Sequence, residues 1–314
     1  KRPTSCNPIH LKLASHAVVK STTACFSICF WSAHHWRCTI MLYSILDQEF
    51  IMKPTLALTA LAFTFYFVSL AHAEIVTKSI TYTQGGVELE GFLAYDSDKA
   101  KADAPGVLIV HQWMGLTDNE KMRAKMLAEL GYVAFALDIY GKGDRPANRG
   151  EAGKFAGKYK GDRKLFRQRL AAGLKVLQSQ SNVNQKKLAA IGYCFGGTGV
   201  LEIARMGAPV LGVVSFHGGL GATLPAEEDA SKTKVLVLHG ADDPFVPKAE
   251  IEGFVKEMND GKFDWQMTYY SGAVHSFTQK EAGNDNSAGA AYNAAADARS
   301  WGAMKQFLNE LFGQ

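Results

Sequence analysis

Three short strings in this sequence place reactive side chains beside turns. The string IGYCFGG surrounds Cys194, the string HGADDPFVP starts at His239 and contains two adjacent acids, and the string GAVHSF contains His275. A thiol, a carboxylate and an imidazole are the groups needed for a nucleophile, for the residue that orients its base, and for the base itself. Together the three strings indicate nucleophilic catalysis.

Cys194 stands where a strand is expected to turn into a helix. The apolar run Leu188–Ile191 predicts a strand before it, and residues 196–205 have a helical pattern after it. A side chain that projects from such a tight turn needs small neighbours two residues away on each side, and Gly192 and Gly196 fill these positions. The free N–H groups of a helix N-terminus also favour a thiolate. This context favours a reactive thiol over a buried structural cysteine.

An acid and a histidine follow Cys194 along the chain. A carboxylate after the predicted strand 235–238 can accept the N–H of a histidine and fix its tautomer. Asp242 and Asp243 both stand there, and the residues alone leave the choice open, because either acid can also cap a turn. The order nucleophile, acid, histidine is that of the triad in α/β-hydrolases, and it singles out His275.

Strand patterns and helical patterns alternate from residue 74 onward. Extended signals cover residues 75–83, 87–95, 107–110, 132–137, 188–191, 210–216, 235–238 and 265–270, and helical patterns cover 119–130, 163–180, 196–205, 248–259 and 288–311. The first two extended signals predict a hairpin across Gly85-Gly86, and the later unalternating runs are typical of strands buried on both faces. We therefore predict an α/β fold with a mostly parallel central sheet, helices on both faces and an N-terminal antiparallel hairpin.

Residues 140–162 are rich in glycine and lysine and interrupt this alternation. We interpret them as an excursion over the carboxyl edge of the sheet, where such folds place their ligands. Arg145 and Arg149 lie in this excursion and are candidates for contact with an anionic substrate, with solvated surface charge as the alternative. His111 and His217 end strands near the same edge, and each is expected either to contact substrate or to form structural hydrogen bonds.

The sequence before residue 74 predicts a leader rather than a folded domain. Residues 52–73 combine a Met, a Lys, an apolar run and the ending Ala-His-Ala, which is the layout of a secretory signal peptide cleaved after Ala73. The apolar run is shorter than the roughly 20 residues that span a bilayer, so we expect no stable membrane insertion after cleavage. Residues 1–51 are then a non-native upstream extension, disordered or poorly structured, and residues 74–314 are one periplasmic or secreted domain.

Charge and cysteine usage change at the same boundary. The whole chain carries a net charge of +4, whereas residues 74–314 hold 28 basic and 28 acidic residues. A neutral domain lacks the basic stripe expected of a nucleic-acid-binding protein. Four of the five cysteines precede residue 74 and match none of the usual zinc spacings, so we predict no metal site there. Cys194 remains alone, with no resolving cysteine for disulfide exchange.

Residues 74–314 resemble the dienelactone hydrolase (carboxymethylenebutenolidase) family of α/β-hydrolases. The shared strings are HQWMGL, IGYCFGG, VSFHGG, HGADDPFVP and GAVHSF, and a cysteine in the turn instead of the usual serine makes the match specific. The resemblance implies Cys194 as nucleophile, His275 as general base and then acid, and Asp243 rather than Asp242 as the orienting carboxylate. It implies a hydrolase of small carboxylic esters or lactones that uses no cofactor and no metal, and we expect a monomer.

Two backbone N–H groups are expected to hold the oxyanion formed on the substrate. The geometry of the turn assigns one to Phe195, the residue after the nucleophile, and the second is expected in the loop after Val110, at Trp113.

Gln112 and Gln279 depart from the family pattern. Gln112 stands where the family commonly has a glutamate that manages the resting thiol, and Gln279 where it has an arginine that binds the substrate carboxylate. We expect these amides to shape the thiol or substrate environment and to favour ester hydrolysis over dienelactone itself. The alternative functions are a thiol-based redox protein and a non-catalytic binding protein on a hydrolase fold. The presence of all three triad residues argues against loss of catalysis.

Overall fold

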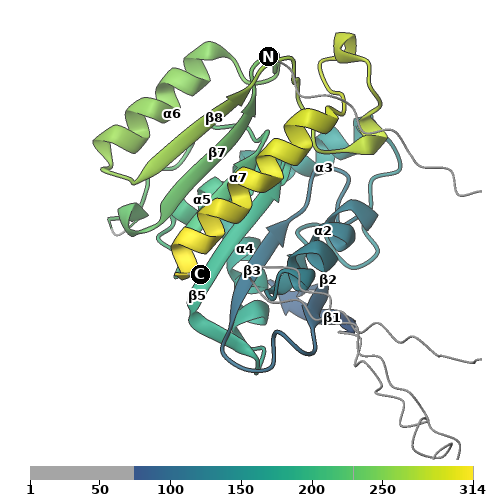
Figure 1. Cartoon of the computed structure of the whole chain (residues 1–314). Helices are drawn as coiled ribbons and strands as arrows, with labels where there is room; N and C mark the ends of the chain where they lie inside the picture. Colours follow the sequence, from purple (N-terminus) through teal and green to yellow (C-terminus); the bar gives the residue numbers. More distant parts are fainter. Residues whose placement is uncertain (1–73, 229, 314) are drawn as a thin grey trace, which may run out of the picture. The chain divides into compact units, whose positions relative to one another are not determined.

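An eight-stranded mixed sheet lies at the centre of the part of the chain that the structure describes (Figure 1). This structure is a computed structural model that describes residues 74–228 and 230–313. The expected signal peptide and upstream extension, residues 1–73, lie outside the described residues. The strands are β1 Ile75–Gln84, β2 Val87–Asp96, β3 Ala104–Val110, β4 Val133–Leu137, β5 Val183–Tyr193, β6 Gly212–Phe216, β7 Lys234–Gly240 and β8 Trp265–Tyr270.

The strand order is β1-β2-β4-β3-β5-β6-β7-β8. β1 pairs with β2 and β2 pairs with β4 in antiparallel register, and every other neighbouring pair is parallel. The predicted hairpin and mostly parallel sheet are therefore confirmed. Because parallel strands end at the same edge, the segments that follow β3, β5, β7 and β8 are brought together there.

Helices cover both faces of the sheet and create two apolar cores. The helices are α2 Asp118–Glu129, α3 Arg149–Gly161, α4 Arg163–Gln178, α5 Phe195–Arg205, α6 Lys248–Asp260 and α7 Ala294–Phe312, with short 3-10 turns η1 Ala230–Lys232, η2 Lys280–Ala282 and η3 Asn286–Ala288. One core packs α3, α4, α5 and α6 against the sheet. The other packs α2 and α7 against the opposite face, where α7 runs across the strands in Figure 1.

Burial on both faces explains the unalternating apolar strands. All five residues of β4 and all five of β6 are buried, because one set of side chains enters each core. β1 and β2 lie at the edge of the sheet, and β1 alternates between exposed and half-buried positions. Among residues 74–228 and 230–313, no helix combines the length and the apolar character needed to cross a membrane.

The structure differs from the sequence prediction at two helices. The expected excursion 140–162 contains a regular helix, α3, which begins where the Asn148 side chain accepts a hydrogen bond from Glu151 N. The last helix begins at Ala294 rather than at residue 288, because Asn293 caps it and Gly289 adopts the left-handed backbone conformation at the end of η3. Both differences lie near the carboxyl edge of the parallel strands, where the candidate site is built.

Candidate active site

The turn between β5 and α5 presents Cys194 at the carboxyl edge of the sheet. Cys194 has φ of 55°, a left-handed conformation that is costly for a residue with a side chain. A methyl group on Gly192 would overlap the carbonyl of Gly196, and one on Gly196 would overlap the carbonyl of Val110. The two glycines therefore permit the close backbone approach that the sequence pattern predicts.

Cys194, His275 and Asp243 form a continuous hydrogen-bonded chain. His275 Nε2 lies 3.0 Å from Cys194 Sγ, and His275 Nδ1 lies 2.8 Å from Asp243 Oδ2. The other carboxylate oxygen of Asp243 accepts a hydrogen bond from Phe245 N at 2.9 Å, which fixes the acid. The arrangement orients the imidazole so that Nε2 faces the thiol. The structure gives no such contact for Asp242, whose side chain is exposed.

The surroundings favour the ion pair of thiolate and imidazolium. Burial raises the pKa of the Cys194 thiol, but the charge and hydrogen bond of His275, the charge of Lys160 and the Phe195 N–H outweigh it, so that the pKa lies below its ordinary value. Burial likewise opposes protonation of His275, yet the Cys194 thiolate and the Asp243 carboxylate raise its pKa well above its ordinary value. The surroundings therefore increase the fraction of reactive thiolate over that of an ordinary cysteine.

Alkylation of Cys194 by iodoacetamide is expected to remain fast at pH values where an ordinary thiol reacts slowly. Thiolate is the reacting species, so the rate falls only as the pH drops through the lowered pKa of Cys194. Intact mass spectrometry across a pH series measures this profile. A His275→Gln variant loses the stabilising imidazolium, and its midpoint is expected at higher pH. A wild-type midpoint no lower than that of glutathione would contradict the ion pair.

The predicted oxyanion donors Phe195 N and Trp113 N belong to residues near the thiol: Phe195 follows Cys194 directly, and Trp113 lines the same pocket. Phe195 N, at the first position of α5, points to Cys194 Sγ and lowers its pKa. Trp113 N has no hydrogen-bond partner among the described residues. The residue that precedes it, Gln112, accepts a hydrogen bond from Met114 N at 2.7 Å through its side-chain oxygen, which shapes the loop after β3. Of the two predicted oxyanion donors, Phe195 N therefore contacts Cys194, and Trp113 N is unpartnered in a residue that lines the same pocket as Cys194.

A pocket of about 810 Å³ opens beside the triad. Its lining includes Cys194, His275 and the predicted pair Gln112 and Gln279. The side-chain nitrogen of Gln279 is buried without a hydrogen-bond partner among the described residues. This volume is in the range of small-molecule sites.

The rest of the pocket lining includes apolar residues and exposed charged residues. Trp113, Met114 and Val246 contribute apolar surface, and the ring of Phe245 lies edge-on to that of His275 at 5.5 Å. The charged residues that line the pocket are all exposed and of both signs: Asp118, Arg149, Lys160 and Glu281. No metal-binding cluster of His, Cys, Asp or Glu occurs within the described ranges.

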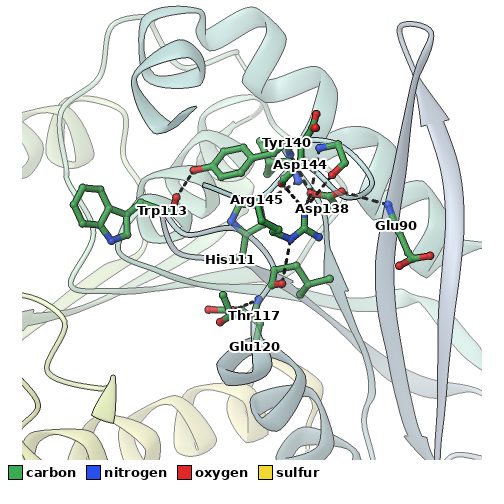
Figure 2. Close-up of polar contacts among 12 residues, drawn as sticks. Glu90, His111, Trp113, Thr117, Glu120, Asp138, Tyr140, Asp144 and Arg145 are labelled. Atoms are coloured by element: carbon green, nitrogen blue, oxygen red, sulfur yellow. Dashed lines mark hydrogen bonds and ion pairs between the residues drawn. The ribbon is translucent and has the colours of Figure 1, made fainter. Parts of the chain in front are cut away.

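The two arginines of residues 140–162 have different environments. Arg149 lines the pocket, but Arg145 pairs with the buried Asp138 and donates hydrogen bonds to backbone carbonyls, among them that of Leu116 (Figure 2). Lys160, which the sequence analysis did not single out, lines the pocket from the end of α3. In the sequence, Asn148 followed three residues later by Glu151 is a helix-start pattern that could have predicted α3.

The histidines His111 and His217 are structural rather than pocket-lining. Both are fully buried. His217 Nδ1 accepts a hydrogen bond from Cys194 N at 3.2 Å, and its Nε2 donates to Thr278 Oγ1 at 2.8 Å. His217 thus joins the turn that carries Cys194 to the loop that carries His275. Burial and the nearby charge of His275 hold the pKa of His217 far below its ordinary value, so it stays neutral.

Comparison with known proteins assigns the chain to a family. The model of the dienelactone hydrolase family matches residues 90–312, which include every strand that carries the site. The chain belongs to the dienelactone hydrolase family. It is therefore a hydrolase, and the prediction of an enzyme that acts on carboxylic esters or lactones is confirmed.

Several known proteins are similar to this dienelactone hydrolase family member over most of its length. A solved dienelactone hydrolase-like promiscuous phosphotriesterase from metagenomic libraries is 40% identical, covers 77% of this chain and 100% of its own, and has a TM-score of 0.71. A Saccharolobus solfataricus protein provisionally named a carboxymethylenebutenolidase is 24% identical over 74% of this chain and 98% of its own. A metagenomic α/β hydrolase, 18% identical with a TM-score of 0.52, shares the fold.

Proposed function

We propose that this protein hydrolyses carboxylic esters or lactones with Cys194 as nucleophile and through an acyl-enzyme. The chain Asp243–His275–Cys194, with distances of 2.8 and 3.0 Å, carries the proposal because it joins an activated thiol to a correctly oriented imidazole. The contact of Phe195 N with Cys194 and the unpartnered N–H of the pocket residue Trp113 support it, since developing negative charge needs such donors.

Acylation follows from the positions of these groups. The Cys194 thiolate forms a C–S bond to the carbonyl carbon, and the electron pair of the carbonyl moves onto its oxygen. Phe195 N and Trp113 N stabilise this oxyanion. When the carbonyl re-forms, the C–O bond to the leaving group breaks, and His275 Nε2 gives its proton to the departing alkoxide. The product is an alcohol and a thioester on Cys194.

Deacylation uses the same residues in the reverse roles. His275, now neutral, takes a proton from a water molecule, and the resulting hydroxide forms a C–O bond to the thioester carbonyl. Asp243 stabilises the imidazolium through Nδ1. Collapse of the second oxyanion breaks the C–S bond, releases the acid and restores the thiolate–imidazolium pair.

Neutral amides in the pocket favour uncharged ester or lactone substrates over dienelactone. Gln112 and Gln279 line the pocket, and the charges that line it are exposed and of both signs. A glutamine cannot supply the bidentate, charged contact that an arginine makes with a carboxylate. We therefore expect the protein to hydrolyse neutral esters more efficiently than dienelactone.

Export to the periplasm or the medium forms part of this proposal. Its support is the signal-peptide pattern of residues 52–73, which lie outside the described residues. The intact mass of the mature protein, purified from the producing organism, tests it. We expect a chain that begins at Glu74, and a chain that retains residues 52–73 would contradict export with cleavage.

Trapping of the acyl group tests the catalytic proposal. Wild-type protein is mixed with p-nitrophenyl acetate or a neutral lactone, quenched in acid within one turnover, and digested for mass spectrometry. We expect one acyl group on the peptide that contains Cys194, in step with release of the first product. Steady turnover of the ester without any acyl group on Cys194 would overturn the proposed nucleophile.

Phosphotriesters are a second candidate substrate class. The support is the 40% identity with the promiscuous phosphotriesterase, whose full length this chain covers. The same thiolate would attack phosphorus, and the aryloxide would leave with the proton of His275. Incubation with paraoxon is expected to place a dialkyl phosphoryl group on Cys194, which mass spectrometry detects. Absence of both this adduct and p-nitrophenol release would exclude the second class.

A further inference from the structure

His111 lies beneath the loop that carries the second oxyanion donor. It is fully buried at the end of β3, and it does not line the pocket. Its Nε2 lies 3.2 Å from Ile139 N, and its Nδ1 lies 2.6 Å from Gln112 O. Because the Ile139 N–H donates, Nε2 must accept, and the ring proton resides on Nδ1. His111 therefore donates a hydrogen bond to the carbonyl of Gln112.

The ring of His111 is locked in this state. Tyr140 packs edge-on at 4.7 Å and Phe195 stacks at 5.9 Å, so the ring has no room to turn. Burial, together with the positive charge of Arg145, lowers the pKa of His111 to about 3, which outweighs the opposing hydrogen bond to Gln112. The imidazole stays neutral and keeps one tautomer across the working pH range.

The carbonyl of Gln112 and the N–H of Trp113 belong to the same peptide group. A hydrogen bond to a peptide oxygen increases the dipole of that peptide and makes its N–H a stronger donor. Gly115 N also donates to Gln112 O, at 3.1 Å. The chain Ile139 N–H, His111, Gln112 carbonyl thus ends at the peptide of Trp113 N–H, the predicted second oxyanion donor.

We propose that His111 is a positioning residue that polarises the Gln112–Trp113 peptide and thereby strengthens Trp113 N–H as an oxyanion donor. The inference rests on the proposed function, in which Trp113 N holds the oxyanion. It goes beyond that function because it assigns the strength of one donor to a side chain that touches neither substrate nor Cys194.

Two neighbouring contacts anchor the same loop at other peptide groups. Tyr140 Oη donates to the carbonyl of Trp113 at 2.9 Å, and Arg145 Nε donates to that of Leu116 at 3.3 Å (Figure 2). Figure 2 shows Tyr140 reaching Trp113 from the segment after β4. Neither bond involves the peptide that carries Trp113 N–H, so loop anchoring and polarisation can be separated by mutation.

Two substitutions at His111 each keep one of its two hydrogen bonds and remove the other. In His111→Asn the side-chain amide lies where Nδ1 was and can still donate to Gln112. In His111→Gln the amide lies where Nε2 was and can still accept from Ile139, but the donation to Gln112 is lost. We expect His111→Gln to lower kcat for p-nitrophenyl acetate about tenfold with KM little changed, and His111→Asn to stay within about threefold of wild type.

The carbonyl stretching frequency of the acyl-enzyme reports on donor strength directly. With a slowly hydrolysed cinnamoyl group on Cys194, His111→Gln is expected to raise this Raman frequency, because the oxyanion donor is weaker. His111→Asn is expected to keep it. Tyr140→Phe, which removes the anchor at Trp113 O, is the matched control and is expected to keep it as well. A merely structural role of His111 would not produce this pattern.

Equal effects of the Asn and Gln variants, or an unchanged frequency in His111→Gln, would overturn the inference while leaving the proposed function intact. Absence of an acyl group on wild-type Cys194 would overturn both. A measurement on the unmodified protein covers the case of a variant that fails to fold. Nitrogen-15 NMR of labelled histidine is expected to show His111 with its proton on Nδ1, and a proton on Nε2 would overturn the inference.

Discussion

Replacement of Cys194 by alanine is expected to lower kcat for ester hydrolysis by roughly four to six orders of magnitude. Removal of the nucleophile of a triad eliminates covalent catalysis and leaves only substrate binding and the oxyanion donors. These two contributions should leave a rate of roughly 10³–10⁴ times that of the uncatalysed reaction. Initial rates with p-nitrophenyl acetate, after subtraction of the buffer rate, measure the effect.

The control for this variant is its unfolding temperature, which shows whether the fold is retained. Cys194 is only half-buried and forms its side-chain contact with His275, so the alanine protein should unfold at a temperature close to that of wild type. Cys194→Ser retains a nucleophile of nearly the same size and is expected to keep a small residual activity. An alanine variant with more than about one per cent of wild-type activity would show that catalysis does not depend on this thiol.

Replacement of Glu202 by alanine is expected to reduce the free energy of unfolding by about 3–5 kcal/mol. Glu202 is fully buried on α5 and pairs with Arg167 at 2.8 Å and with Arg205 at 3.1 Å. Arg205 is also fully buried, and among residues 74–228 and 230–313 Glu257 would remain as its one carboxylate partner. A buried guanidinium that loses a partner is costly, since it cannot be solvated in place. Equilibrium unfolding in urea measures the loss.

The matched control breaks an ion pair on the surface. Lys256 and Asp260 pair along α6 with both side chains largely exposed. Asp260→Asn is therefore expected to change the free energy of unfolding by less than about 1 kcal/mol, because water and salt screen exposed pairs. A similar loss in Glu202→Ala and Asp260→Asn would show that the buried pair contributes no more than the exposed one.

The triad was predictable because its residues follow strand ends and carry local signals. Cys194 is flanked by the glycines that its turn requires, and Asp243 follows the buried apolar strand β7. His275 follows β8, an edge strand of which only Tyr270 is buried, so the expectation of burial on both faces was wrong for this strand. Parallel strands then bring these ends together without any further information. The choice of Asp243 over Asp242 required the family resemblance, and in the structure only Asp243 bonds to His275.

The helix α3 was not predicted because its glycines obscure the helical pattern. The segment RGEAGKFAGKYKG has a glycine at nearly every fourth position, which weakens helix propensity and the apolar stripe. The helix forms because Asn148 caps it and because Ala156 and Tyr159 enter the core. Lys160 was therefore missed as a pocket residue. The hydrogen bonds of His111 were also unpredictable, since Ile139 lies 28 residues away and approaches only through the pairing of β3 with β4.

The position of α3 has a consequence for how this enzyme changes over evolutionary time. The groups that perform the reaction follow β3, β5, β7 and β8, whereas α3 comes from the segment between β4 and α4 and supplies Arg149 and Lys160 to the pocket. Within α3 only Ala152, Ala156 and Tyr159 are buried, and its other residues are exposed or half-buried. Mutations there can alter which molecules are accepted while the catalytic apparatus is inherited unchanged. For laboratory selection of new substrates, the exposed positions of residues 148–161 are the ones to randomise first.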